Sequence, residues 1–182
     1  MIYTRVADIY KAIDETRERL YKRVEGLNQE QASARRDANA WSATEIVEHL
    51  TIMEERLVRM MKVMLTKAEG ASVKSDRATV EIKPFSLDEL VARSRNEKYI
   101  APEAMRPSGT VQLAQLLERL RQSRVELLSL RPRIEATDLS EFTYSHPAFG
   151  PLNCYQWLAF IGLHEGRHLR QLESVMAAEI EL

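Results

Sequence analysis

Four long segments with the period of an α-helix constrain the fold of this chain more than any other feature. In each segment apolar side chains recur every three or four residues, which places them along one face of a helix. The segments cover about residues 6–27, 46–64, 108–131 and 153–177. Helices of this length predict an all-α four-helix bundle, in which each helix buries its apolar face against the others. The apolar positions are Val6, Ile9, Ile13, Leu20, Val24 and Leu27; Ile46, Leu50, Met53, Leu57, Met60 and Met64; Leu113, Leu116, Leu117, Leu120, Leu127 and Leu128; and Trp157, Phe160, Ile161, Leu172 and Val175.

The second segment has a clear helix start. Ser42 and Glu45 have the spacing of a capping box, and Trp41 is placed to pack against Ile46 as a hydrophobic staple. Pro132 is expected to end the third segment, because proline disrupts a helix interior. The sequence shows no convincing strand.

A long connection separates the second and third segments. Residues 69–107 are too many for a simple hairpin loop between helices, so they are expected to cross the length of the bundle. Within this connection, Ser86 and Glu89 form another possible capping box before Leu87, Leu90 and Val91, which predicts a short extra helix.

Composition limits the class of protein. A chain of 182 residues suits one domain, expected to cover residues 1–182, and 45% hydrophobic with 29% charged residues is typical of a folded protein. The formal net charge of -1 disfavours nucleic acid and membrane partners. No apolar run is long enough to span a bilayer, and the N-terminal residues lack the apolar stretch of a signal peptide. A single cysteine, Cys154, excludes an intrachain disulfide, so we expect a cytoplasmic protein.

Three histidines interrupt the apolar faces. His164 and His168 are four residues apart, so they lie one turn apart on the core face of the fourth helix. His49 interrupts the second helix in the same way. At a rise of about 1.5 Å per residue, His49 lies about 11 Å and His168 about 14 Å from neighbouring ends of their helices, if the two are antiparallel. Burying an imidazole without a partner costs roughly 1–3 kcal/mol, and a shared divalent metal ion would compensate for it.

This spacing leaves more than one interpretation open. Three neutral imidazoles with an open fourth position are typical of a catalytic zinc or similar site, whereas three unrelated core histidines are the alternative. The string from His164 to His168 also reads H-E-x-x-H, in which Glu165 would be the general base of a zinc peptidase. A zinc peptidase is disfavoured, because such enzymes bind substrate along a strand edge and the sequence shows no convincing strand. A solvated position on the flank of the helix is the more ordinary expectation for Glu165.

Other residues near this face have candidate roles. Gln171 is placed to orient a ligand, and Arg56 to hold an anionic group of a substrate or cofactor. The more ordinary expectation for Arg56, and for Arg124 on the third helix, is an internal ion pair with a glutamate. His146 lies in the loop before the fourth helix, and an antiparallel layout puts it at the far end from the metal. Cys154 lies more than two helical turns before His164, too far to bind the same metal ion on one straight helix, and is expected to have a packing role.

These residues resemble a known family. The segment from Trp41 to Leu50, the H-P-A-F-G-P-L segment at 146–152, and the H-x-x-x-H-x-x-Q pattern ending at Gln171 are similar to the DinB/YfiT-like superfamily across most of the chain. The A-P-E residues at 101–103 are similar to its branch with the H-P-x-x-G loop. The resemblance implies an up-down-down-up bundle with a long crossover between the second and third helices. It also implies a site for nickel, zinc, iron or manganese, with ligands His49, His164 and His168.

The resemblance leaves the reaction open. Members include transferases and isomerases that use low-molecular-weight thiols, and proteins described as metal-dependent hydrolases. We therefore expect a metal-dependent transferase or hydrolase that acts on a small-molecule substrate, with a thiol as a possible cofactor. The alternative is a metal-holding or interaction module without turnover. The methionine- and leucine-rich second and third helices also suggest a homodimer.

Overall fold

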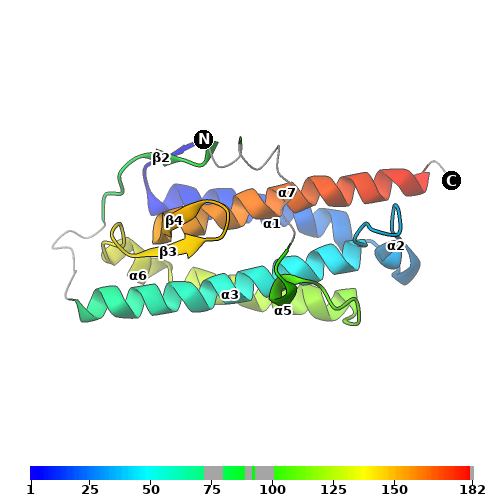
Figure 1. Ribbon diagram of the computed structural model, residues 1–182, viewed down its shortest axis with the longest axis horizontal. Helices are drawn as coiled ribbons and strands as arrows, with labels where there is room; N and C mark the ends of the chain where they lie inside the picture. The colour runs from blue at the N-terminus through cyan, green and yellow to red at the C-terminus, as the bar shows by residue number, and fades with distance from the viewer. Residues whose placement is uncertain (72–79, 89–91, 93–100, 181–182) are drawn as a thin grey trace.

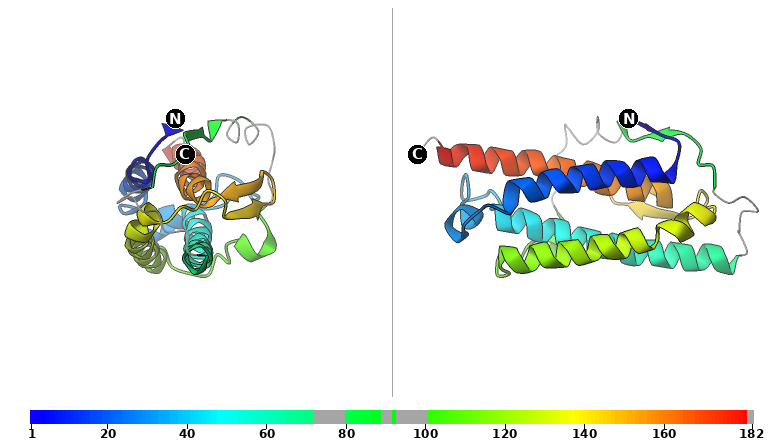
Figure 2. Two further views of the ribbon diagram at one scale, coloured as in Figure 1. Left: turned by 90° about the vertical axis from the view of Figure 1, so that its left-hand side faces the viewer. Right: turned by 180° about the vertical axis from the view of Figure 1, so that it is seen from behind.

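Four long helices form the bundle in the computed structural model, which describes residues 1–71, 80–88, 92 and 101–180. They are α1 (Val6–Val24), α3 (Ala43–Gly70), α5 (Leu113–Ser129) and α7 (Cys154–Ile180). The helices α1 and α7 run in one direction, and α3 and α5 run in the other (Figure 1). In the end view of Figure 2, α1 lies beside α7 and α5 lies beside α3. The predicted four-helix bundle with up-down-down-up connectivity is confirmed.

The connection between α3 and α5 has to run along the bundle, because the two helices are parallel. The chain leaves α3 at one end and enters α5 at the other (Figure 1). Along this connection, β2 (Phe85–Ser86) pairs antiparallel with β1 (Ile2–Tyr3), and a 3-10 turn, η1 (Glu103–Met105), follows. Ser86 therefore ends a strand, and Leu90 and Val91 of the predicted extra helix lie outside the described residues.

The predicted start of the second long helix is confirmed. The Ser42 hydroxyl accepts a hydrogen bond from the backbone N–H of Glu45 at 3.2 Å. The Glu45 carboxylate accepts one from the backbone N–H of Ser42 at 2.9 Å. A short helix that the sequence did not reveal, α2 (Gln29–Ser33), precedes it and has its own capping box at Asn28. These caps satisfy amide groups that a helix start otherwise leaves without partners.

Replacing Ser42 with alanine is expected to lower the free energy of unfolding by about 1 kcal/mol, because the cap then loses its acceptor. Denaturant unfolding of the two proteins measures this difference. Ser33→Ala, on the exposed last residue of α2, serves as a control and is expected to change the stability much less. An equal effect of both substitutions would contradict a specific contribution from the cap.

Both ends of the third predicted helix differ from the expectation. The helix begins at Leu113 instead of residue 108, because Ser108 and Gly109 donate hydrogen bonds to the Glu48 carboxylate from a non-helical loop, in which Gly109 has a φ of 71°. Its other end lies at Ser129, and Pro132 does not close it. Pro132 lies in the first turn of a further helix, α6 (Arg131–Ala136), where its missing N–H costs no helical hydrogen bond.

The expectation that the chain contains no strand was wrong. The strands β3 (Thr143–His146) and β4 (Gly150–Asn153) form an antiparallel hairpin that pairs His146 with Gly150. Gly150 has a φ of 74°, a left-handed conformation that glycine adopts easily. Only Leu152 in these strands is fully buried, so the sequence lacks the alternation that reveals longer strands.

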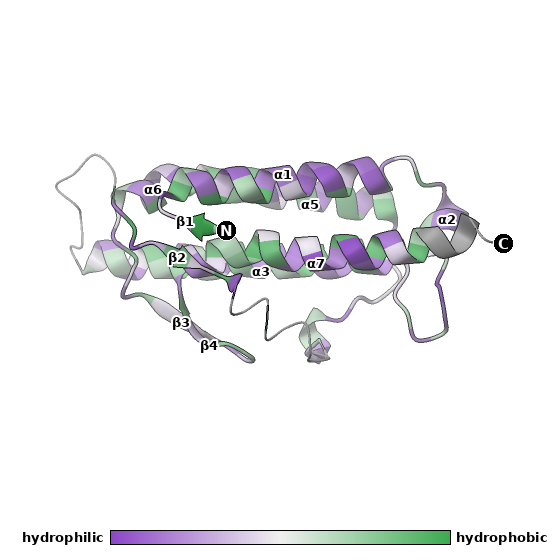
Figure 3. Cartoon of the chain, turned by 90° about the horizontal axis from the view of Figure 1, so that it is seen from above, coloured by the Kyte–Doolittle hydropathy of each residue, from purple (hydrophilic) through white to green (hydrophobic). Residues whose placement is uncertain are grey.

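The core consists of two apolar clusters separated along the bundle. On α1, for example, Ile9 and Ile13 belong to one cluster, and Leu20 and Val24 belong to the other. Buried polar residues lie between the clusters on every long helix, among them Arg17, Glu54, Ser123, Arg124, Glu165 and His168. Figure 3 shows the same helices coloured by hydropathy, with the pair α1 and α5 beside the pair α3 and α7. No helix among the described residues has the length and apolar character needed to cross a membrane.

Candidate metal centre

The three predicted histidines meet between α3 and α7. One ring nitrogen from each of His49, His164 and His168 lies within 4.8 Å of the others. The two helices are antiparallel (Figure 1). His49, near the start of α3, therefore meets His164 and His168, which lie near the middle of α7. The sequence-based expectation that these histidines converge is therefore confirmed.

Hydrogen bonds orient two of the rings. Nδ1 of His49 lies 2.7 Å from the Met105 carbonyl oxygen, which is an acceptor, so Nδ1 carries the proton and donates it. Nδ1 of His168 lies 2.9 Å from Oε1 of Gln171 and donates to it in the same way. In a neutral imidazole only one nitrogen carries a proton, so Nε2 of each ring is left with a free lone pair. This is the arrangement that a metal ligand requires, and partners at Nδ1 commonly fix it.

Burial keeps the three rings neutral. Exposure of His49 is 4% and that of His168 is 8%, whereas His164 retains more exposed surface. Burial lowers the pKa of His49, and burial together with the neighbouring His49 lowers the pKa of His168 to about 3. The pKa of His164 also lies well below its usual value, because the ring is surrounded by protein and by two other imidazoles. At neutral pH the site therefore offers three uncharged nitrogen donors, the form that binds a metal.

The spacing of two donor atoms fits a metal ion. Nε2 of His49 and Nε2 of His164 are 3.3 Å apart. Metal–nitrogen bonds of about 2.0–2.1 Å with tetrahedral angles place two ligand nitrogens about 3.3 Å from each other. Imidazole donors suit zinc, nickel, copper and iron. The three residues thus match a divalent transition metal in chemistry, and the His49–His164 pair also matches it in spacing.

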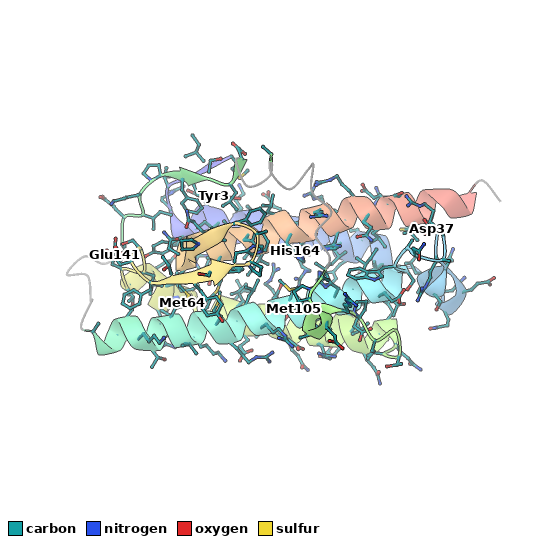
Figure 4. All side chains as sticks on the ribbon, in the orientation of Figure 1. Tyr3, Asp37, Met64, Met105, Glu141 and His164 are labelled. Carbon is teal, nitrogen blue, oxygen red and sulfur yellow. The ribbon has the colours of Figure 1, made fainter. Side chains whose placement is uncertain are left out.

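Two structural features close the sides of the trio. The Trp41 ring stacks on His168, with ring centroids 6.1 Å apart, and lies 5.0 Å from the ring of His49. The turn η1 provides the Met105 carbonyl on the side of α3, and Figure 4 shows Met105 and His164 close together near the middle of the bundle. His49 and His168 are buried and His164 is partly exposed, so the side of His164 is the one open to ligands from solvent.

Gln171 and Arg56 have different surroundings. The contact of Gln171 with His168 agrees with its predicted orienting role. Arg56 is exposed and donates to the Ala104 carbonyl at 3.0 Å, so it helps to hold the segment beside η1. Among the residues that the structure describes, Arg56 makes no ion pair with a glutamate, so the expected internal ion pair is not found there. Its predicted role in binding an anionic group stays a prediction.

Glu165 is buried, which corrects the ordinary expectation that it lies in solvent on the flank of the helix. Its exposure is 1%, and its carboxylate accepts hydrogen bonds from Nε of Arg17 at 2.6 Å and from Arg124 at 3.4 Å. Arg17 and Arg124 also bind the buried carboxylate of Glu54. The two arginines and two glutamates come from four different long helices, and we call them the ion layer. The expected internal ion pair of Arg124 is thereby confirmed.

The predicted base, Glu165, is therefore engaged by two cations within the ion layer. Burial raises the pKa of Glu165 above its usual value, against the opposing effect of Arg17 and Arg124. Both carboxylate oxygens are nevertheless occupied by these charged donors, so Glu165 is not free to contact a ligand bound at the histidines. Sequence reasoning missed Arg17 and Glu54. The available signal was a charged residue in place of an apolar one on every long helix.

His146 does not lie at the far end from the site, which corrects the sequence-based expectation. The hairpin folds back along α7, and the His146 ring contacts Phe160 with ring centroids 4.9 Å apart. Phe160 in turn lies 5.6 Å from the ring of His164. His146 is absent from the cluster of ligand atoms, so its exclusion as a metal ligand agrees with the structure. Cys154 is fully buried and burial raises the pKa of its thiol to about 12, which fits the predicted packing role.

Comparison with known proteins places the chain in a family. The family model of the DinB superfamily matches residues 12–172. The chain belongs to the DinB superfamily. The uncharacterized protein YuaE of Bacillus subtilis strain 168 is 29% identical over 163 residues, which cover 89% of this chain and 93% of YuaE.

Solved structures share the fold. The four-helix bundle protein TT2238 matches with a TM-score of 0.62 and 20% identity, over 93% of this chain and 98% of that one. YfiT from B. subtilis, described as a probable metal-dependent hydrolase with an unusual four-helix bundle topology, matches with a TM-score of 0.52 and 14% identity, over 94% and 86%. An uncharacterised protein from Escherichia coli UTI89 gives a TM-score of 0.57 and 13% identity, over 96% and 94%. At these identities the likeness shows the fold alone.

Proposed function

We propose that this protein is a metal-dependent enzyme that holds one divalent ion with His49, His164 and His168. The observation that carries the proposal is the 3.3 Å separation between Nε2 of His49 and Nε2 of His164. All three rings are neutral, and partners at Nδ1 orient those of His49 and His168. A metal-dependent activity is also what the description of YfiT suggests for a related fold. Three ligands leave a coordination position open, which is typical of catalytic sites.

We further propose that the reaction is a nucleophilic transfer in which a small thiol attacks a small-molecule electrophile. A divalent ion with three neutral ligands lowers the pKa of a bound thiol or water toward neutrality. The protein's own residues fix the ligands: Met105 and Gln171 hold two imidazoles by their Nδ1 atoms. No step requires a protein base, which fits the engagement of Glu165 by arginines.

Thiol transfer has stronger support than hydrolysis, because Glu165, the predicted base, is engaged by arginines. Water has to lose a second proton during hydrolysis, and a base such as the glutamate of a zinc peptidase normally accepts it. A thiol is deprotonated more readily than water, so it depends less on such a base. The buried Cys154 has a raised pKa and is not a nucleophile, which leaves an external thiol for this role.

The test is metal-dependent conjugation of chlorodinitrobenzene with cysteine, glutathione and other small thiols in turn. The thiolate sulfur forms a bond to the ring carbon and chloride leaves, so the product is followed by its absorbance. We expect activity in the metal-loaded protein and its loss in His49→Ala. Arg170→Ala, on the exposed face of α7, is the matched control and should keep the full rate.

Two other results would replace this proposal. Hydrolysis of esters or amides without conjugation, in a manner that depends on Glu165, would identify a hydrolase. A stoichiometric metal content without turnover of any electrophile, ester or amide would identify a metal-holding module without catalysis.

A further inference from the structure

The tip of the β3–β4 hairpin, residues 146–150, lies beside the side of the metal centre that ligands have to enter. The hairpin and η1 project on the same side of the bundle, beyond the pair α3 and α7 (Figures 2 and 3). Phe160 lies one turn before His164 on the same face of α7, and its ring joins the tip to the metal ligand. The tip therefore extends the metal centre outward along α7.

Aromatic rings form the surface of this extension. His146 stacks on Phe149, with ring centroids 4.5 Å apart and an angle of 23° between the rings. Phe149 contacts Phe160 edge to face at 6.0 Å. Phe149 and His146 both remain partly exposed, whereas Phe160 is buried beneath them. The tip thus presents an apolar aromatic surface next to a site made of polar imidazoles.

His146 adds a hydrogen-bond donor to this surface. Its Nδ1 accepts a hydrogen bond from the backbone N–H of Ala148 at 3.1 Å, so the neutral ring carries its proton on Nε2. Within the described part of the chain, His146 makes its hydrogen bond through Nδ1 and none through Nε2. Half-burial lowers the pKa of His146, which agrees with a neutral ring at pH 7. The backbone of the tip therefore fixes which nitrogen can donate to a ligand.

We propose that the hairpin tip recognises the substrate, with Phe149 binding its apolar or aromatic body and Nε2–H of His146 donating to an acceptor oxygen. This inference rests on the proposed metal-dependent function, because it places the reacting end of the substrate at the trio of ligands. It selects small molecules with an aromatic or aliphatic body next to an oxygen acceptor. Highly charged substrates are disfavoured by an aromatic surface that has one neutral donor.

Two metal-directed probes with the same chelating group test this proposal. Acetohydroxamate and benzohydroxamate differ only in a methyl and a phenyl group, and their binding to the cobalt-loaded protein is measured by the change in the cobalt absorption spectrum. Contact of the phenyl ring with the tip is expected to favour benzohydroxamate by about tenfold. Phe149→Ala should remove this preference and leave the affinity for acetohydroxamate unchanged.

The role of His146 is tested with His146→Phe and His146→Gln. His146→Phe keeps an aromatic ring without a donor, and should weaken both probes about fivefold to tenfold through the lost hydrogen bond. His146→Gln keeps a donor and should restore part of the affinity for acetohydroxamate. Tyr144→Ala, an exposed position on the same hairpin, is the matched control and should bind both probes as the unmodified protein does.

The results separate this inference from the proposed function. If the protein takes up cobalt and binds both probes equally, and neither Phe149→Ala nor His146→Phe changes either affinity, the tip does not recognise ligands and the metal centre still stands. If the protein takes up no cobalt, the proposed function and the inference both fail. Cobalt content, measured in every variant, also shows whether the metal centre remains folded.

Discussion

Replacing His168 with alanine is expected to abolish metal binding, whereas the unmodified protein should purify with about one divalent ion per chain. His168 is 8% exposed and is held by Gln171, so it provides a fixed donor that no neighbouring side chain replaces among the described residues. Two remaining imidazoles give a much weaker site. Metal content by mass spectrometry, after dialysis against metal-free buffer, measures the difference.

A histidine outside the trio provides the control. His146→Phe removes an imidazole from the same region but not from the cluster of ligand atoms, and should retain the ion. Metal at full stoichiometry in a double variant of His49 and His168 would exclude this site. Chelation should also lower the stability of the unmodified protein, by about 2.7 kcal/mol when free metal had been present at 100 times its Kd. The same chelation should leave His168→Ala unchanged.

Helical periodicity explains why the fold and the histidine trio could be predicted. The positions of His49, His164 and His168 on apolar faces fix their direction toward the core, and the distance from a helix end fixes their depth. Both quantities are local, so a single sequence contains them. An antiparallel arrangement of the second and fourth helices was then the only additional assumption.

The environment of Glu165 could not be predicted in the same way. It follows His164 directly, and a step of one residue turns the side chain by about 100° around the helix, away from the metal side. Whether that direction leads to solvent or to another helix depends on the packing of α1 and α5. The cations Arg17 and Arg124 reach it from those two helices, over separations of 148 and 41 residues.

The predicted position of His146 was wrong for a related reason. The prediction requires the residues before the fourth helix to extend beyond the end of that helix. A hairpin whose strands have four residues each instead turns the chain back along α7, so its tip approaches His164. Short strands that contain Pro151 and bury only one side chain carry too little pattern to reveal such a turn.

Replacing Glu54 with glutamine is expected to lower the free energy of unfolding by about 3–5 kcal/mol. The substitution leaves Arg17 and Arg124 at the centre of the bundle with only Glu165 as a buried counter-ion. Ser123 and Arg124 both donate to Oε1 of Glu54, and an amide cannot replace all of these contacts. Because stability is commonly 5–15 kcal/mol, this loss is a large part of the total.

The adjacent residue on α3 is the matched control for the ion layer. Glu55 pairs with Arg119 on the surface, where both side chains are partly exposed, so Glu55→Gln should cost less than about 1 kcal/mol. Urea unfolding of both variants without metal separates the two cases.

Arg17 and Arg124 hold the pKa of buried Glu54 below its usual value of 4.5, against the opposing effect of burial. A lowered folded-state pKa gives stability that is present above pH 4.5 and is lost as the pH falls. The difference in free energy of unfolding between the unmodified protein and Glu54→Gln should therefore be full at pH 7 and shrink below pH 4.5. Equal effects of Glu54→Gln and Glu55→Gln at pH 7 would show that the ion layer does not stabilise the packing of the four helices.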